Sequence, residues 1–123
     1  MTTLEQPVRG RLSSQRVRNA REAMLDGPTR ELVQSVRDIL CEPTRTQIVR
    51  VLSQGPLSVG ELASILGRSK SATSQHLRVL RDAGIVSARR RGRIVMYSLS
   101  NAPMISATVQ VLEHAASLSA DAA

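Results

Sequence analysis

The sequence of 123 residues contains no phenylalanine, no tryptophan, one tyrosine and one cysteine. A single cysteine excludes a disulfide within the chain and any zinc site made of clustered cysteines. Because Tyr97 is the only aromatic residue, the core has to consist of aliphatic side chains, which pack well between short helices. The N-terminus has no long apolar run, so we expect neither a signal peptide nor a membrane span, and we expect a cytoplasmic protein.

Residues of the types that perform catalysis are also scarce. The chain has two histidines, and no spacing suggests a nucleophile paired with a base. The run Gly67-Arg68-Ser69-Lys70-Ser71 lacks the residue order of a phosphate-binding loop and the strand that precedes one. We therefore expect no enzyme activity and no cofactor.

Positive charge is concentrated in one segment. The formal net charge is +7, and residues 67–93 hold seven arginines and one lysine against Asp82 alone. This segment carries as much charge as the whole chain. A solvated surface usually mixes both signs, whereas a segment of one sign more often faces a polyanion such as nucleic acid.

Apolar periodicity predicts a domain of short helices over residues 28–123. Helices are expected over about 29–40, 43–53, 58–66 and 69–82, with a last helix after Pro103. Two strands, 85–88 and 94–99, would flank a basic turn at 89–93 and form a β-hairpin. Residues 1–27 form a basic extension, in which 1–13 should be mobile and 14–25 could form a helix. This helix is either a solvated tail or an arm that contacts DNA or the partner subunit.

The middle of this domain has the pattern of a helix-turn-helix. Ser58 and Glu61 have the spacing of a capping box, and Gly67 fits the end of the same helix. Ser69 can cap the next helix after a tight turn. Two such helices followed by a hairpin predict a mainly α winged helix-turn-helix, with about five helices and a two-stranded wing.

The second of these helices has one apolar and one polar face. Thr73, Leu77 and Leu80 would point inward, because they recur at steps of three and four residues. The opposite face carries the candidate DNA-reading residues Lys70, Ser71, Ser74, Gln75 and Arg78. An amide such as Gln75 can pair with adenine, and a basic residue such as Arg78 can pair with guanine or a phosphate.

Two further basic sites complete the expected interface. Arg68 lies in the turn before the helix, and the wing holds Arg89, Arg90, Arg91 and Arg93. Four guanidinium groups so close together repel one another, and a DNA backbone or minor groove would stabilise them. The alternative is an ordinary solvated charge run.

Several separated motifs together resemble the ArsR/SmtB family of winged-helix repressors. They are Cys41-Glu42-Pro43-Thr44-Arg45, Glu61-Leu62-Ala63, the whole run from Ser69 to Val86, Arg91-Gly92-Arg93 and Tyr97-Ser98-Leu99. The resemblance covers about residues 29–115. It implies a homodimer formed by the first and last helices, an inverted-repeat operator, and repression released by an inducer. It also places Ser71, Ser74, Gln75 and His76 where the family reads DNA.

The usual metal ligands of this family are missing. The helix expected over 58–66 has no thiol, and the last helix offers only Glu113 and His114, which are adjacent and so point about 100° apart. A metal site shared across the dimer would need both pairs. We therefore expect no typical metal inducer, and an unidentified small molecule stays open.

Cys41 and the type of partner leave alternatives. Cys41 is expected to be a small buried residue, or else a single redox-responsive thiol. A winged helix that binds a protein or an RNA is the alternative to a repressor that binds double-stranded DNA.

Overall fold

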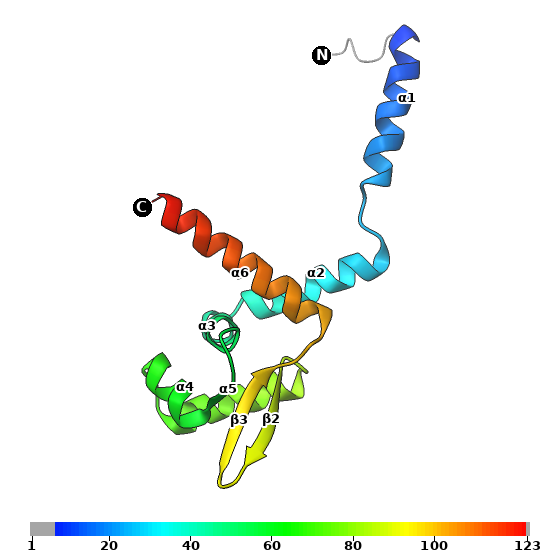
Figure 1. The fold of residues 1–123 in the computed structure, drawn as a ribbon. Helices are drawn as coiled ribbons and strands as arrows, with labels where there is room; N and C mark the ends of the chain where they lie inside the picture. The colour runs from blue at the N-terminus through cyan, green and yellow to red at the C-terminus, as the bar shows by residue number, and fades with distance from the viewer. Residues whose placement is uncertain (1–6, 123) are drawn as a thin grey trace. The chain divides into compact units, whose positions relative to one another are not determined.

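The computed structural model describes residues 7–122, with side chains from residue 13 onward. The chain forms two units, one ending at Glu31 and the other running from Leu32. The described residues form, in order, α1 (Pro7–Glu22), α2 (Gly27–Leu40), α3 (Pro43–Leu52), β1 (Leu57–Ser58), α4 (Val59–Leu66), α5 (Lys70–Asp82), β2 (Val86–Arg91), β3 (Ile94–Leu99) and α6 (Pro103–Ala122) (Figure 1). This is a winged helix-turn-helix, as the sequence predicts, with an additional N-terminal helix.

The N-terminal helix begins earlier than its sequence predicts. The expected helix over 14–25 is α1, which starts at Pro7 and ends at Glu22, so residues 7–13 are helical rather than irregular. Residues 1–6, also expected to be mobile, lie outside the described residues. After α1, the carboxylate of Asp26 accepts the Thr29 N–H at 2.8 Å. Hydrogen bonds from the Thr29 side chain and from this N–H lower the pKa of Asp26, and the N–H bond also satisfies a free donor in the first turn of α2.

The caps of the helix-turn-helix are those that the sequence predicts. The Ser58 Oγ accepts the Glu61 N–H at 3.2 Å, while the Glu61 carboxylate accepts the Ser58 N–H at 2.9 Å. Gly67 ends α4 with a φ of 67°, a left-handed conformation that costs glycine little. The Ser69 Oγ then accepts the Ala72 N–H at 3.0 Å and begins α5. These local bonds fix the turn between α4 and α5.

The wing is larger than the two strands expected from the sequence. It is a three-stranded antiparallel sheet in the order β1-β3-β2, in which Leu57 pairs with Tyr97. The second correction concerns the arginines: β2 continues through Arg89, Arg90 and Arg91, and only two residues form the turn. Gly92 begins this turn with a φ of 66°, as the first central position of a type II′ hairpin requires.

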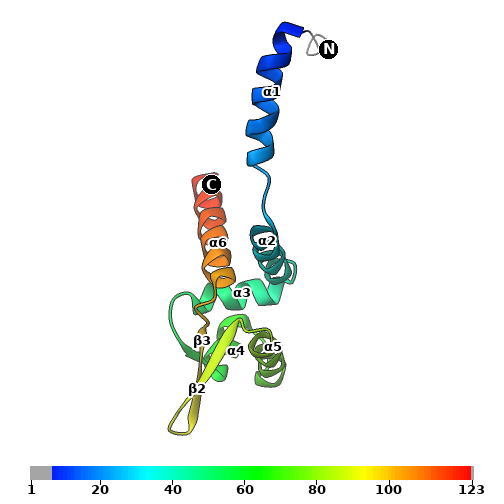
Figure 2. The same cartoon turned by 90° about the vertical axis from the view of Figure 1, so that its right-hand side faces the viewer.

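A single aliphatic core holds the helix-turn-helix and the sheet together. Its buried members come from α2, α3, α4, α5, β2, the residue preceding β2, and α6: Ile39, Ile48, Val49, Leu52, Leu62, Leu77, Leu80, Ile85, Val86 and Ile105. The inward stripe of α5 is confirmed, because Thr73, Leu77 and Leu80 are all buried. The Thr73 hydroxyl donates to the Ser69 carbonyl at 2.8 Å, so this buried polar group has a hydrogen-bond partner. Figure 2 shows α4 and α5 beside each other, with the β2–β3 hairpin extending beyond them.

Truncation of a buried residue of α5 should destabilise the domain. Leu77→Ala removes a side chain that is 0% exposed, and we expect the free energy of unfolding to fall by about 2–5 kcal/mol. Val79→Ala is the matched control, because Val79 lies on the same helix and is 52% exposed, so its effect should stay within about 0.5 kcal/mol. Urea unfolding at one protein concentration measures both variants. Equal losses in the two would contradict the inward orientation of the stripe.

Candidate nucleic-acid interface

The outward face of α5 presents polar and basic side chains. Lys70, Ser71, Ser74, Gln75 and Arg78 are all exposed, and the buried stripe lies on the other side of the helix. Because successive residues turn by about 100°, these five positions share one broad face. The first turn of α5 also contains N–H groups that have no acceptor within the helix, and such groups can donate to a phosphate. The prediction that these five side chains lie opposite the buried stripe is therefore confirmed.

Arg81 belongs to the same face, although the sequence reasoning did not include it. It is exposed in the last turn of α5, three residues after Arg78 and seven after Ser74. Those steps return to nearly the same side of a helix, so the spacing alone could have identified it.

The arginines of the wing point to two different sides. Side chains alternate along a strand, so Arg89 and Arg91 share one face of β2 and Arg90 lies on the other. Arg89 and Arg91 line a hollow of about 530 Å³ together with the hydroxyls of Ser87 and Ser98. Arg93 follows Gly92 in the exposed turn. The wing thus offers one patch with two arginines and two hydroxyls, not a uniform basic tip.

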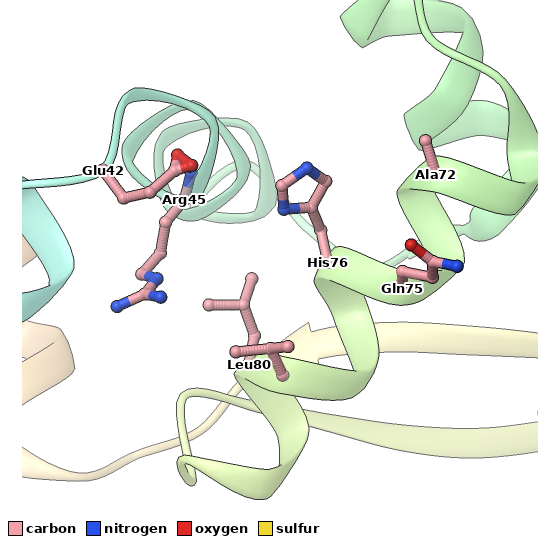
Figure 3. A pocket seen from close by; sticks show the side chains of 7 residues that line it. Glu42, Arg45, Ala72, Gln75, His76 and Leu80 are labelled. Carbon is pink, nitrogen blue, oxygen red and sulfur yellow. The ribbon is translucent and has the colours of Figure 1, made fainter.

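His76 is less exposed than the neighbouring Gln75. It is half-buried and lines a hollow of about 290 Å³ between α5 and the start of α3, together with Glu42, Arg45, Gln75 and Leu80. Figure 3 shows its ring directed toward Glu42, while the side chain of Gln75, which also lines the hollow, points away from that ring. The resemblance placed His76 among the DNA-reading residues, but its side chain faces α3.

Glu42 holds the start of α3 in place opposite His76. Its carboxylate accepts the N–H groups of Thr44 at 2.6 Å and Arg45 at 3.2 Å. Burial opposes the charged form, but these two bonds and the nearby charges of His76 and Arg45 lower the pKa of Glu42 below its ordinary value. Arg45 in turn donates to the Asp38 carbonyl at 2.9 Å. The hollow is therefore bordered by a fixed carboxylate and a guanidinium that is already bound.

Arg68 connects the turn of the helix-turn-helix to α3. Its Nη2 donates to the Thr44 Oγ1 at 3.0 Å, across a sequence separation of 24 residues. Thr44 is buried, so this bond satisfies a hydroxyl that water cannot reach easily. Arg68 is otherwise exposed, and its remaining N–H groups are available to a phosphate beside α5.

The candidate sensor residues are spread over the fold. Cys41 is exposed, which corrects the expectation of a buried thiol, and its sulfur donates to the Asp38 carbonyl at 3.3 Å. Glu113 and His114 are both exposed on α6. Among residues 7–122, no three side chains of His, Cys, Asp or Glu gather closely enough to hold a metal ion. Within the same residues, no helix is long and apolar enough to cross a membrane.

Comparison with known proteins shows which family the segment that contains α5 matches. Residues 42–88, from the start of α3 into β2, match the family described as "Bacterial regulatory protein, arsR family". The matched segment contains α3, α4, α5 and the turn that joins the last two.

Curated relatives and solved structures extend this match. The chain is 43% identical over 82 residues to the HTH-type transcriptional regulator NmtR of Mycobacterium tuberculosis, covering 67% of this chain and 68% of NmtR. It is 36% identical over 75 residues to the transcriptional repressor SmtB homolog of Synechocystis, covering 61% of this chain and 57% of that protein. The solved structure of HlyU from Vibrio cholerae aligns with a TM-score of 0.62 and 35% identity, over 70% of this chain and 92% of HlyU.

Proposed function

We propose that this chain, which belongs to the ArsR family of bacterial regulatory proteins, represses transcription as a homodimer bound to an inverted-repeat operator. As a member of this family it is a DNA-binding transcriptional regulator and not an enzyme. The observation that carries the proposal is the exposed polar face of α5, which stands opposite a fully buried stripe. A helix packed on one side and polar on the other can enter the major groove of DNA. We propose that the chain binds DNA in the cytoplasm.

We assign different roles to the residues of the interface. Ser71, Ser74, Gln75 and Arg78 would read base edges, because they are exposed and short or capable of paired hydrogen bonds. Lys70, Arg68 and the wing arginines Arg89, Arg90, Arg91 and Arg93 would bind phosphates, which gives affinity without sequence information. His76 would hold α5 against α3 rather than read a base, since its ring lies at the hollow beside Glu42.

Two helices support the proposed dimer. Every described residue of α6 from Glu113 onward is exposed, yet Val111 and Leu118 are apolar, 45% and 56% exposed, and separated by seven residues on one side of the helix. Val33 of α2 is also exposed. An apolar stripe on a helix that continues past its own core fits a contact with the same helix of a second copy. Two copies would present two α5 helices to two half-sites about 34–36 Å apart.

Removal of a base-reading side chain should reduce sequence preference. We expect Gln75→Ala and Arg78→Ala each to weaken binding to the preferred operator by about 1–3 kcal/mol, while binding to unrelated DNA changes much less. The operator is first obtained by selection from random duplexes with the full chain. Fluorescence anisotropy then measures both duplexes. Equal losses on operator and unrelated DNA would contradict the assignment of α5 as the reader.

Substitution of Arg89 and Arg91 in the wing should weaken DNA binding without changing sequence preference. We expect Arg89→Gln with Arg91→Gln to weaken operator and unrelated DNA alike, and to lower the log–log salt slope by about 0.9 for each phosphate that the variant no longer neutralises. Arg37→Gln is the control, because it removes an exposed arginine of α2 whose ion-pair partner is Asp38 at 3.3 Å. A reduction confined to the operator would mean that the wing reads sequence instead.

The dimer can be tested on α6 with a matched pair of variants. We expect Val111→Asp with Leu118→Asp to give monomers, because two carboxylates would replace the proposed apolar contact. Gln110→Asp with Ser117→Asp adds the same charge at the same spacing on another side of α6, and both of those residues are exposed. Sedimentation at micromolar concentration should show a dimer for the wild-type chain and this control. A dimeric Val111/Leu118 variant would refute the proposed interface.

We further propose that the inducer is not a typical metal ion. The support is the composition of the family's usual ligand positions: no thiol lies in α4, and Glu113 and His114 are adjacent on α6. Addition of zinc should therefore leave operator affinity unchanged, as should oxidation of the thiol when wild-type chain and Cys41→Ser are compared. Weaker operator binding with zinc that the substitution His114→Ala abolishes would show a metal site shared between subunits instead.

A further inference from the structure

The helix α1 carries a density of positive charge that the proposed operator contacts do not use. Residues 7–22 contain five arginines and one glutamate, and they lie outside the matched segment 42–88. From Ser14 to Glu22 every residue is exposed. The charge is therefore available to a partner that is not already part of this chain.

The side chains of α1 are basic on more than one side. At about 100° per residue, Arg16 and Arg18 point about 160° apart, and Arg21 lies close to Arg18. Val17 is the single large apolar residue from 13 to 22, and it is half exposed. Residues 13–22 of α1 therefore have no apolar stripe for burial in a protein groove or among lipid tails.

Few interactions within α1 offset the mutual repulsion of its arginines. The Gln15 amide donates to the Asn19 side chain at 2.8 Å, and Arg18 donates to the Gln15 carbonyl oxygen. Such i,i+4 and i,i+3 pairs contribute only about 0.2–0.5 kcal/mol each. Residues 13–22, the part of α1 whose side chains the structure describes, bury no apolar face, and such a helix is marginal in water, so a polyanion along it would stabilise both the charge and the fold.

We propose that α1 binds the phosphate backbone of the DNA that flanks the operator. This inference rests on the proposed function, because α5 and the wing bring the DNA to the chain. Arginines directed to opposite sides of a helix can reach phosphates on both strands bordering one groove. Sixteen residues span about 24 Å, which corresponds to about 7 base pairs beyond each half-site. Because α1 is joined to a domain that already holds DNA, even weak contacts add affinity through effective concentration.

The test compares two duplexes and three proteins. One duplex contains only the selected operator, and the other extends it by about ten base pairs of arbitrary sequence on each side, which exceeds the span of α1. The proteins are the wild-type full chain, the variant Arg16→Gln/Arg18→Gln/Arg21→Gln, and the control Arg30→Gln/Arg37→Gln, which removes two exposed arginines of α2. Glutamine keeps a good helix former at each position.

We expect the extended duplex to bind the wild-type chain and the control more tightly than the short duplex does. The triple variant should gain nothing from the extension, and its salt slope on the extended duplex should be smaller by about 2.7 for each bound α1. When salt rises from about 50 to 200 mM, the affinity of the wild-type chain should therefore fall by a factor about 40 times larger than that of the triple variant. DNase protection should shorten in parallel at both ends of the site.

Two results would overturn the proposal. One is an equal gain, or no gain, from the extension in the wild-type chain and the triple variant. The other is binding of the wild-type chain to vesicles of anionic phospholipid that the triple variant does not show, with no change on the extended duplex. Absence of binding to the short duplex by all three proteins would instead refute the proposed operator function.

Discussion

The packing of one side of α5 determines what the other side can do. Leu77 and Leu80 are buried among side chains of α3, α4 and the sheet, and the Thr73 hydroxyl is satisfied within its own helix. This burial leaves the helix no freedom to rotate about its axis, because any rotation would expose aliphatic surface to water. Ser74, Gln75 and Arg78 therefore have to face outward, whether or not DNA is present.

Much of this arrangement could be predicted from sequence because its causes are local. The capping box of Ser58 and Glu61, the left-handed Gly67 and the cap at Ser69 each depend on residues three or four positions apart. The stripe of α5 follows from helical periodicity alone. The same reasoning predicted the hairpin but ended its first strand too early, since arginine has no strong preference for a turn or a strand when a neighbouring strand supplies its hydrogen bonds.

Features that depend on distant residues were out of reach. The two residues of β1 gain their strand conformation only from pairing with Met96 and Tyr97. The inward position of His76 depends on α3, whose Glu42 lies 34 positions earlier in the sequence, and the bond from Arg68 to Thr44 depends on the same helix. Exposure of Cys41 likewise follows from the end of α2, not from the residue type. His76 and Arg68 therefore each connect α5, or the turn before it, to the start of α3, which the sequence alone did not predict.

The proposed function depends most on α5 lying in the major groove of each half-site. The variant Cys41→Ser/Val79→Cys has a single thiol at an exposed position of α5 that we do not assign to base reading, and an iron chelate attached there cleaves DNA within reach of that position. If α5 lies in the major groove, two cleavage clusters are expected within the operator, about 10 base pairs apart from centre to centre, with strand offsets typical of the major groove. Diffuse cleavage along the duplex, or cleavage restricted to the flanks of a site that is still bound, would contradict it.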